Sequence, residues 1–331
     1  MSPKMVLTLS SHYSFVEEDY VTHGLDNIKG GNEFRNLYEL GEIIGYGRYS
    51  EVRFASSKST REIYACKIVN KLKIPQPWRL RDEIKILKSA KHRNIVSLHD
   101  IFETEREVLM LLELATGGEL FNQIIQKGRY TEKGAKEIVR SLIDATSFLH
   151  SRNIIHRDIK PENILLGHDH DPNRTLVLIS DFGLAKVLED AADESDSSGM
   201  DFGKDVELSR SISCCSLETV GGRLRATSGC GSDYYVAPEI LNGESYDEKV
   251  DMWSIGVVMF LLLSGDHPFG NDSGGISEVY SDIRQGNYKF SHPAWSNISP
   301  AAKDLVSRLL TVNPEKRISS KDACNHSWFQ G

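Results

Sequence analysis

The sequence predicts an α+β protein, with strands in its first third and helices in most of the remainder. The chain has 331 residues, 40% of them hydrophobic, and is too long for one compact core. It fits one two-lobed domain or two small domains. Apolar residues alternate as in strands between Tyr38 and Val69, and they recur at helical spacing between Thr131 and Ser151. Runs of strands followed by helices are typical of the α+β class.

The formal net charge is −8, and most of it lies in one segment. Residues 189–207 hold eight acidic side chains and a single base, Lys204. The rest of the chain is therefore nearly neutral and shows no basic stripe, so we predict no nucleic-acid partner.

The cysteines indicate a reducing compartment. Their number is odd and their spacing is unlike that of metal ligands; they are Cys66, Cys214, Cys215, Cys230 and Cys324. We predict free thiols and a cytoplasmic or nuclear location.

We expect neither secretion nor membrane attachment. The sequence starts without a basic patch followed by an apolar run, and it shows no motif for myristoylation or prenylation. The longest apolar run, Met252 to Leu263, is too short to span a bilayer and predicts a buried helix.

Strand-forming residues begin at Tyr38. Residues 1–37 show no sustained period, and we expect them to form a partly disordered leader arm. Gly45 and Gly47 then stand between β-formers, which predicts a hairpin whose backbone can approach phosphate oxygens closely. A strand from Ile63 to Val69 follows.

Further elements alternate between buried strands and helices. Helical spacing of apolar residues predicts a helix from Trp78 to Leu87, and residues 105–112 form an apolar strand. The helix from Thr131 to Ser151 carries one apolar face. The residues of this face are Ala135, Ile138, Leu142, Ala145 and Leu149.

The richest stretch is His156-Arg-Asp158-Ile-Lys160-Pro-Glu162-Asn163. Asp158 offers a carboxylate that can accept a hydroxyl proton, Lys160 offers a cation for a phosphate, and Asn163 offers an oxygen for a magnesium ion. A phosphoryl-transfer transition state is loose and highly charged, and it needs groups of these kinds to position the nucleophile and neutralise charge.

A second acidic motif follows 23 residues later, where an apolar strand from Thr175 ends in Asp181-Phe-Gly183. The copy at Asp201-Phe-Gly203 lacks a preceding strand, and we reject it. Residues 167–171, Gly-His-Asp-His-Asp, resemble a metal cluster, but a polar hairpin tip is the better interpretation because nothing holds these side chains convergent.

Fifty-eight residues separate Asp181 from Glu239, which implies an insertion. Residues from about 188 to 224 are rich in acidic residues, Ser and Gly, and we predict disorder there. The chain after Glu239 reads as helical.

These motifs, in this order, resemble the eukaryotic Ser/Thr protein kinases over residues 38–329. They are Gly45-Tyr-Gly47, Lys67, Glu83, the stretch from His156 to Asn163, Asp181-Phe-Gly183 and Ala237-Pro-Glu239. Thr116-Gly-Gly-Glu-Leu-Phe121 and His326-Ser-Trp-Phe329 resemble the calcium/calmodulin-dependent protein kinase (CAMK) group. The resemblance implies a bilobal fold with a small lobe at residues 38–112 (antiparallel sheet plus one helix), a hinge at 113–118 and a mainly helical lobe at 119–329.

The resemblance also implies roles for individual residues, with ATP and Mg²⁺ as cofactors. The implied catalytic residues are Asp158, Lys160, Asn163, Lys67 and Glu83, with Asp82 as a second candidate to pair with Lys67. The implied metal ligands are Asn163 and Asp181. The implied ATP contacts are Ile44, Gly45, Gly47, Val52, Ala65, Lys67, Leu112, Glu113, Ala115, Glu119 and Leu165. Arg317 is the expected ion-pair partner of Glu239, and Leu87, Leu98, His156 and Phe182 are expected to stack.

Substrate choice and regulation follow from the same resemblance. Glu119 and Glu162 resemble the acidic pair that selects substrates with arginine upstream of the acceptor, and Ser232 stands where the family usually has Thr. An activation-segment phosphate is expected to pair with Arg157. Ser228 is the first candidate phosphosite and Ser213 the second, each with an arginine three residues before it.

We expect phosphorylation by an upstream kinase or by a second copy of the chain, and no calmodulin-binding segment within it. The third glycine of the usual loop is Ser50 here, a departure shared by many members of the group. A pseudokinase scaffold and a metabolic kinase of related fold are the alternatives. The presence of Lys67, Glu83, Asp158 and Asp181 disfavours the first, and the Ala-Pro-Glu segment disfavours the second.

Overall fold

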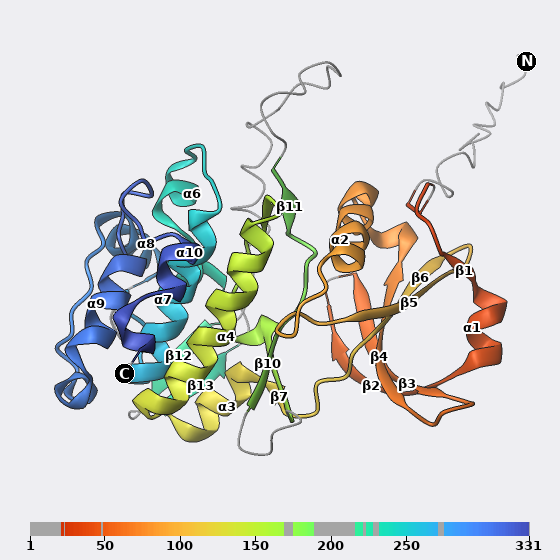
Figure 1. The fold of residues 1–331 in the computed structure, drawn as a ribbon, viewed down its shortest axis with the longest axis horizontal. Helices are drawn as coiled ribbons and strands as arrows, with labels where there is room; N and C mark the ends of the chain where they lie inside the picture. Colours follow the sequence, from red (N-terminus) through yellow and green to blue (C-terminus); the bar gives the residue numbers. More distant parts are fainter. Residues whose placement is uncertain are drawn as a thin grey trace, which may run out of the picture. The chain divides into compact units, whose positions relative to one another are not determined.

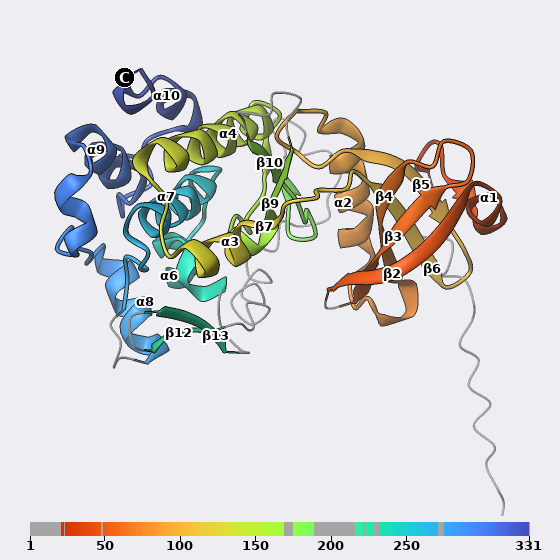
Figure 2. The ribbon, with the colours of Figure 1, turned by 90° about the horizontal axis from the view of Figure 1, so that it is seen from below.

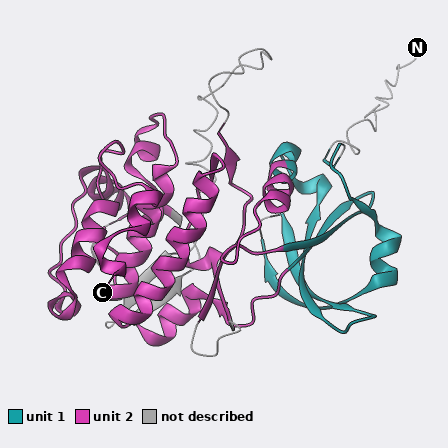
Figure 3. Cartoon of the chain, in the orientation of Figure 1, with its two compact units in different colours: residues 1–81, 98–112 teal, residues 82–97, 113–331 magenta. Residues whose placement is uncertain are grey.

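The computed structural model describes residues 21–22, 24–47, 49–168, 175–188, 216–220, 223–227, 232–270 and 275–330. The chain divides into two compact units (Figure 3). Unit 1 comprises residues 1–81 and 98–112, and unit 2 comprises residues 82–97 and 113–331. Unit 1 is built mainly of strands and unit 2 mainly of helices, which confirms the predicted α+β class.

Unit 1 contains a six-stranded sheet with the order β1-β5-β6-β4-β3-β2 (Figure 1). Its strands are β1 (Lys29–Gly30), β2 (Tyr38–Tyr46), β3 (Ser50–Ser57), β4 (Ile63–Asn70), β5 (Leu98–Glu103) and β6 (Glu107–Leu112). Neighbouring strands pair antiparallel, except that β1 runs parallel to β5. Its helical segments are α1 (Gly31–Leu37), the 3-10 turn η1 (Lys71–Lys73) and the first part of α2 (Pro77–Ser89).

Part of the expected leader arm belongs to unit 1. Phe34 of α1 is only 4% exposed, and its ring lies edge-on to Phe102 at 5.1 Å. Tyr38 completes this aromatic group, 5.6 Å from Phe34. The described part of unit 1 therefore includes residues before Tyr38, which the sequence pattern did not indicate because a single buried aromatic side chain leaves no period. Residues 1–20 and 23 lie outside the described residues.

The helices of unit 2 are α3 (Leu120–Lys127), α4 (Glu132–His150), α6 (Pro238–Asn242), α7 (Lys249–Ser264), α8 (Ile276–Gln285), α9 (Pro300–Leu309) and α10 (Ser320–Cys324). Its strands are β7 (Gly118–Glu119), β8 (Ile154–Ile155), β9 (Ile164–His168), β10 (Thr175–Ile179), β11 (Lys186–Val187), β12 (Ser216–Val220) and β13 (Arg223–Thr227). Its 3-10 turns are η2 (Pro161–Asn163), η4 (Ser232–Tyr235), η5 (Pro293–Asn297) and η6 (Ser327–Phe329). Strands β10, β9 and β7 form a small sheet that α3 contacts (Figure 2).

Helix α7 lies at the centre of unit 2, and every residue from Val250 to Ser264 is buried. Gly256 lets α9 approach, because a Cβ there would meet Leu309 and Leu310 at 2.8 Å. The five residues predicted to form the apolar face of α4 are all buried. Thr131 caps α4 by accepting a hydrogen bond from Gly134 N at 3.2 Å.

The predicted ion pair between Glu239 and Arg317 is confirmed. Arg317 Nη1 and Nη2 donate to the two carboxylate oxygens of Glu239 at 2.7 and 2.9 Å. Both side chains are almost fully buried, and Arg317 also donates to the carbonyls of Thr311 and Val312. This bidentate ion pair fixes the start of α6 against the loop after α9.

Residues 82–97 group with unit 2, whereas the small lobe predicted from the sequence, residues 38–112, includes them. Ile95 forms a β-bridge with Ile179, and Asn94 donates through its side chain to the carbonyl of Val177 at 2.8 Å. These hydrogen bonds tie the segment after α2 to β10, a pairing that no local sequence pattern indicates.

Most of residues 188–224, where we predict disorder, lie outside the described residues, but the described part includes β12 and the start of β13. Strands β12 and β13 pair antiparallel, with Glu218 opposite Arg225. The sequence signal was Gly221-Gly222 between two β-forming runs, a pair typical of tight hairpins. The rejected Asp201-Phe-Gly203 copy and residues 169–174 lie outside the described residues, although β9 and β10 on either side of the latter do pair antiparallel.

Among the described residues, no helix combines the length and the apolar character needed to cross a membrane.

We predict that Phe34→Ala lowers the free energy of unfolding by about 3–5 kcal/mol, because it removes a buried aromatic ring and leaves a cavity beside Phe102. Urea denaturation of the full chain measures this. Leu37→Ala, at a position 42% exposed on the same helix, is the control and should cost about 0.5 kcal/mol or less. Equal effects of the two variants would mean that α1 contributes no core.

Candidate active site

Asp158 contacts the side chains of Lys160 and Asn163 in unit 2. Lys160 Nζ is 2.9 Å from both carboxylate oxygens of Asp158. Asn163 Nδ2 donates to Asp158 Oδ2 at 2.7 Å and to the Asp158 carbonyl at 2.8 Å. Residues 158, 160 and 163, which the sequence analysis singled out, are thus brought together by η2.

The electrostatics of this cluster suit a proton acceptor. Burial raises the pKa of Asp158, and the nearby Asp181 carboxylate adds to the rise, while Lys160 opposes it. Burial acts to lower the pKa of Lys160, but Asp158 outweighs it and the pKa is raised. Lys160 therefore stays charged beside a carboxylate that is more basic than usual.

The backbone before Asp158 is held by a buried carboxylate. Asp251, in the first turn of α7, accepts from His156 N at 2.9 Å and from Arg157 N at 2.8 Å. Arg157 has φ +66°, a left-handed conformation that costs a residue with a Cβ about 1–2 kcal/mol. The two hydrogen bonds compensate this strain and fix the direction in which the chain enters Asp158.

Asn163 and Asp181 form a ligand set suited to magnesium. Both Ser180 N and Ser180 Oγ donate to the carbonyl of Asn163, at 2.9 and 3.0 Å, so Asp181 follows directly on a residue bound to Asn163. The amide nitrogen of Asn163 faces Asp158, which turns its Oδ1 to the opposite side. Mg²⁺ binds through one or two such oxygens together with phosphates and water, so these residues fit it.

No cluster of three or more His, Cys, Asp or Glu side chains that could hold a metal occurs in the part of the chain that the structure describes. The candidate cluster at residues 167–171 is described only as far as His168 in β9.

Glu83 of α2 lies beside the Asp181 motif within unit 2. A Cβ added to Gly183 would stand 3.7 Å from Glu83 Oε2 and 3.3 Å from Asp181 Oδ1. Lys67 belongs to unit 1, so its pairing with Glu83 or Asp82 stays a prediction. In the expected stack, the rings of His156 and Phe182 do meet, at 4.8 Å.

Unit 1 places most of the expected nucleotide contacts on one face of its sheet. Gly45, Val52 and Lys67 lie opposite one another on β2, β3 and β4. Ala65 lies two residues before Lys67 on β4 and therefore shares its face of the sheet. Ala65 pairs with Leu112 of β6, and residues opposite each other in antiparallel strands also share a face. Ile44 lies at an irregularity in the β2–β3 pairing, and Gly47 N donates to Ser50 O at 2.8 Å.

The hinge and the following turn carry the remaining expected contacts in unit 2. Glu113 N donates to Ser97 O at 2.9 Å, whereas the N–H and C=O of Ala115 make no backbone hydrogen bond within the described residues. Backbone polar groups seek partners, so Ala115 is suited to meet the edge of a base. Glu119 pairs with Leu165 across β7 and β9, which puts both on one face.

One carboxylate oxygen of Glu162 lacks a hydrogen-bond donor within the described residues. This oxygen, Oε2, is buried. Burial raises the pKa of Glu162, and the carboxylates of Asp158 and Glu119 act in the same direction, although Lys160 opposes them. Burial also raises the pKa of Glu119. A cation arriving between these carboxylates would therefore be stabilised.

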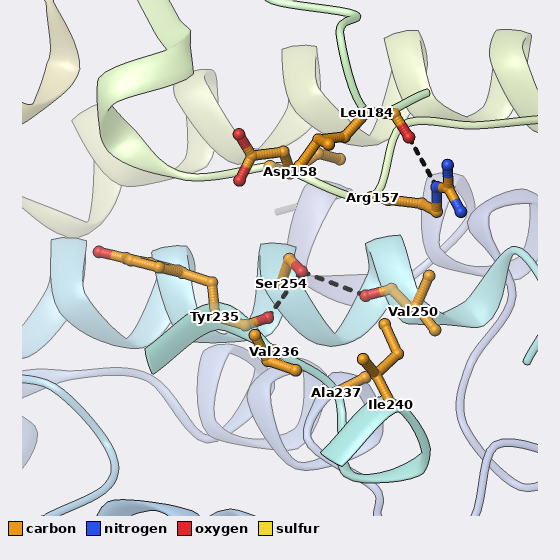
Figure 4. Close-up of a pocket in the computed structure, with 10 residues that line it drawn as sticks. Arg157, Asp158, Leu184, Tyr235, Val236, Ala237, Ile240, Val250 and Ser254 are labelled. Carbon is orange, nitrogen blue, oxygen red and sulfur yellow. Dashed lines mark hydrogen bonds between the residues drawn. The ribbon is translucent and has the colours of Figure 1, made fainter. Parts of the chain in front are cut away.

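The segment toward Glu239 shows how Arg157 is held. Its Nε donates to the Leu184 carbonyl and its Nη1 to the Tyr246 hydroxyl, both at 2.6 Å. Arg157, Asp158 and Leu184 line a small cavity of about 30 Å³ together with Tyr235 to Ala237 (Figure 4). Ser232 begins η4, but its side chain, Ser213 and Ser228 lie outside what the structure describes.

His267, a loop residue next to this segment, is not among the residues predicted from the sequence. Its ring stacks on Tyr234 at 4.4 Å and meets Tyr235 edge-on at 5.7 Å. Neither ring nitrogen has a hydrogen-bond partner within the described residues, and burial lowers the pKa of His267 to about 4. A neutral imidazole thus supports the two tyrosines. No sequence signal marks it, because contact across the fold creates its environment.

The comparisons with known proteins agree with this geometry. The family described as "Protein kinase domain" matches residues 38–329. Myosin light chain kinase A of Dictyostelium discoideum is 37% identical over 300 residues, 90% of each chain. Calcium/calmodulin-dependent protein kinase type 1 of Caenorhabditis elegans is 36% identical over 299 residues, 90% of this chain and 75% of the relative. The probable serine/threonine-protein kinase fhkC of D. discoideum is 35% identical over 327 residues, and this chain spans about half of its length.

We predict that acid destabilises the protein in part through His267. Its folded pKa lies below the ordinary value of 6.5, so the unfolded state binds more protons as the pH falls from 6.5 toward about 4. The free energy of unfolding should drop by up to about 3 kcal/mol over this interval from this group. His267→Phe keeps an aromatic ring on Tyr234 and should lose that part of the drop. Urea titrations between pH 4 and 8 measure it, and parallel curves for the two proteins would contradict the assignment.

Proposed function

The chain belongs to the protein kinase family, in its calcium/calmodulin-dependent group, and we propose that it phosphorylates serine or threonine downstream of arginine in protein substrates. The relatives are named as serine/threonine kinases, and this chain is a protein serine/threonine kinase like them. Protein kinases use ATP with Mg²⁺. No observation favours a scaffold without transfer.

The buried, unpartnered Oε2 of Glu162 is the observation that supports the arginine preference. A buried carboxylate oxygen without a hydrogen-bond donor is costly, so binding of a cation at this oxygen would be favourable. Glu119, also with a raised pKa, lies close enough to add its charge. A guanidinium presents several donors in a planar fork and suits two carboxylates better than a point charge does.

Asp158 is the proposed acceptor of the substrate hydroxyl proton. Its raised pKa and its contacts with Lys160 and Asn163 hold a basic oxygen in a fixed direction. Lys160, charged and within reach of the same space, would neutralise the phosphoryl group as it moves toward the hydroxyl. Ser232 is proposed to orient the substrate beside them.

ATP, when bound with Mg²⁺, would supply the γ-phosphoryl group, and ADP would be the leaving group. We propose that Asn163 and Asp181 hold the metal and that Lys67, paired with Glu83, holds the phosphates. The backbone of Glu113 and Ala115 would bind the adenine edge, within an apolar surface to which Val52, Ala65, Leu112 and Leu165 contribute. Gly45 and Gly47, with Ile44, would cover the phosphates and sugar.

Regulation by activation-segment phosphate is also proposed. In the structure the contacts of Arg157 include the Leu184 carbonyl and the Tyr246 hydroxyl. A phosphate on Ser228 would offer this guanidinium a charged acceptor, which forms a stronger hydrogen bond. Ser213 is the second candidate, and either could be modified by an upstream kinase or by a second copy. A cytoplasmic or nuclear location, inferred from the thiols, completes the proposal.

We predict that the wild-type chain transfers labelled phosphate from ATP and Mg²⁺ to a peptide with arginine three residues before serine. Asp158→Asn should lower kcat by at least about 100-fold, because the amide cannot accept the proton. ATP binding, followed by fluorescence titration, should persist in the variant. Equal transfer by the two proteins would exclude Asp158 as the acceptor.

The arginine preference has its own control in Glu162→Gln, which keeps the shape of the side chain and removes its charge. This variant should raise KM about tenfold for the arginine peptide, by the loss of a charge-assisted contact worth about 1.5 kcal/mol, and leave the same peptide with alanine at that place unchanged. An equal KM change for both peptides would reject the preference while leaving the kinase activity standing.

We predict that Ser228→Ala abolishes most activity gained on incubation with ATP and reduces the incorporated phosphate, since the variant cannot carry the phosphate proposed to contact Arg157. Mass spectrometry and the peptide assay measure both. Ser213→Ala is the matched variant and should have the smaller effect. Full activity and unchanged phosphate content of Ser228→Ala would overturn the proposal. Use of the inactive Asp158→Asn chain as substrate tests transfer between copies.

A further inference from the structure

A chain of hydrogen bonds runs from the C-terminal helix α10 to the loop that carries Asp158. Ser320 Oγ, at the start of α10, lies 3.1 Å from His150 Nδ1, at the end of α4. The other ring nitrogen, His150 Nε2, lies 3.0 Å from Asp251 Oδ2. Ser320 and Asp251 are 6% and 1% exposed, and the His150 side chain is equally buried. All three residues belong to unit 2.

The order serine, histidine, aspartate resembles a hydrolytic triad, but its surroundings exclude that chemistry. A nucleophilic serine must stand open to its substrate, whereas the Ser320 side chain is enclosed between α10 and α4. The Asp251 carboxylate also accepts from the backbone of His156 and Arg157, so it serves the loop as well as the imidazole. The three residues therefore stabilise the local structure and do not catalyse acyl transfer.

Each link restricts the next. A hydroxyl on Nδ1 fixes the rotation of the imidazole ring, and the fixed ring directs Nε2 at one oxygen of Asp251. The Asp251 carboxylate then has both oxygens committed, Oδ1 to Arg157 N and Oδ2 to His150 and His156 N. Arg157 keeps its left-handed conformation only while these bonds hold it, and Asp158 is the next residue.

We propose that Ser320 is a positioning residue for phosphoryl transfer, acting through His150 and Asp251 to hold the backbone from which Asp158 projects. The inference rests on the proposed role of Asp158 and adds the C-terminal helix to the groups that set its position. Small displacements of a catalytic group cost large factors in rate, whereas substrate contacts elsewhere in the site remain. Loss of the Ser320 hydroxyl should therefore lower kcat and leave KM nearly unchanged.

Ser319 supplies a matched control one residue away. It caps α10 by accepting from Asp322 N at 3.1 Å, and its hydroxyl lies 2.7 Å from Asp322 Oδ2, so its bonds stay within the helix. Ser319→Ala and Ser320→Ala each remove one hydroxyl from the same turn. Only the second breaks the chain that leads to Asp251.

The experiment measures kcat, KM for ATP and peptide, and the unfolding midpoint of the full chain for both variants. We expect Ser320→Ala to lower kcat about tenfold with each KM within about twofold, and Ser319→Ala to keep kcat at the wild-type value although its cap is lost. Equal kcat values for the two variants, whether both lowered or both unchanged, would overturn the proposal. A wild-type chain without transfer would instead reject the proposed function itself.

A double-mutant cycle separates the chain of bonds from general loosening of α10. In a His150→Asn background the link to Asp251 is already broken, so adding Ser320→Ala should change kcat by less than about twofold. An undiminished tenfold effect of Ser320→Ala in that background would show that the serine acts by another route and would overturn the assignment.

Discussion

The buried carboxylate of Asp251 is the constraint on which the catalytic loop depends. Removing such a charge from water costs several kcal/mol unless donors surround it. Three donors do so, His150 Nε2 and the backbone N–H groups of His156 and Arg157. Burial acts to raise the pKa of Asp251, yet His150 and the other donors lower it below its usual value. The charge is therefore compensated only when the loop has its native shape.

The candidate active site carries more negative than positive side chains. Asp158, Asp181, Glu162 and Glu119 bring four carboxylates into one region, whereas Lys160 is the cation that the structure places in direct contact with Asp158. Burial is the main cause of the raised pKa values of Asp158, Glu162 and Glu119, and for Asp158 and Glu162 the neighbouring carboxylates add to it. Cations brought by the ligands, metal on the side of Asp181 and substrate on the side of Glu162, would reduce the excess of negative charge. The same excess of carboxylates would therefore favour both the proposed metal ion and the proposed arginine side chain of the substrate.

Much of the fold and the motif residues could be predicted from the sequence, because each rested on local chemistry. The α4 face, the buried α7 and the strands carrying Gly45 and Lys67 follow from periodicity. Asp251 and His150 gave no comparable signal. The role of an acidic residue in the first turn of an apolar helix can be recognised only when its hydrogen-bond partner 95 residues away is known. His267 and Phe34 were missed for the same reason: their environments are made by tertiary contacts.

Acidic composition gives no information on short paired segments within a charged stretch. A charge-rich segment can contain a short hairpin when two β-forming runs flank a glycine pair, as β12 and β13 show. Composition describes an average over the segment, whereas strand pairing depends on a few residues. The bridge from Ile95 to Ile179 is a further tertiary contact that no local sequence pattern indicates.

The parallel pairing of β1 with β5 has a consequence for the association state of shortened forms. The family match begins at Tyr38, but β5 forms an inner strand of the sheet only because Lys29 and Gly30 lie beside it. A chain beginning at Tyr38 would present the backbone donors and acceptors of β5 at an open edge, beside an uncovered Phe102. An open strand edge can pair with strands of other chains. Lys29 and Gly30, which cover this edge, would therefore reduce aggregation.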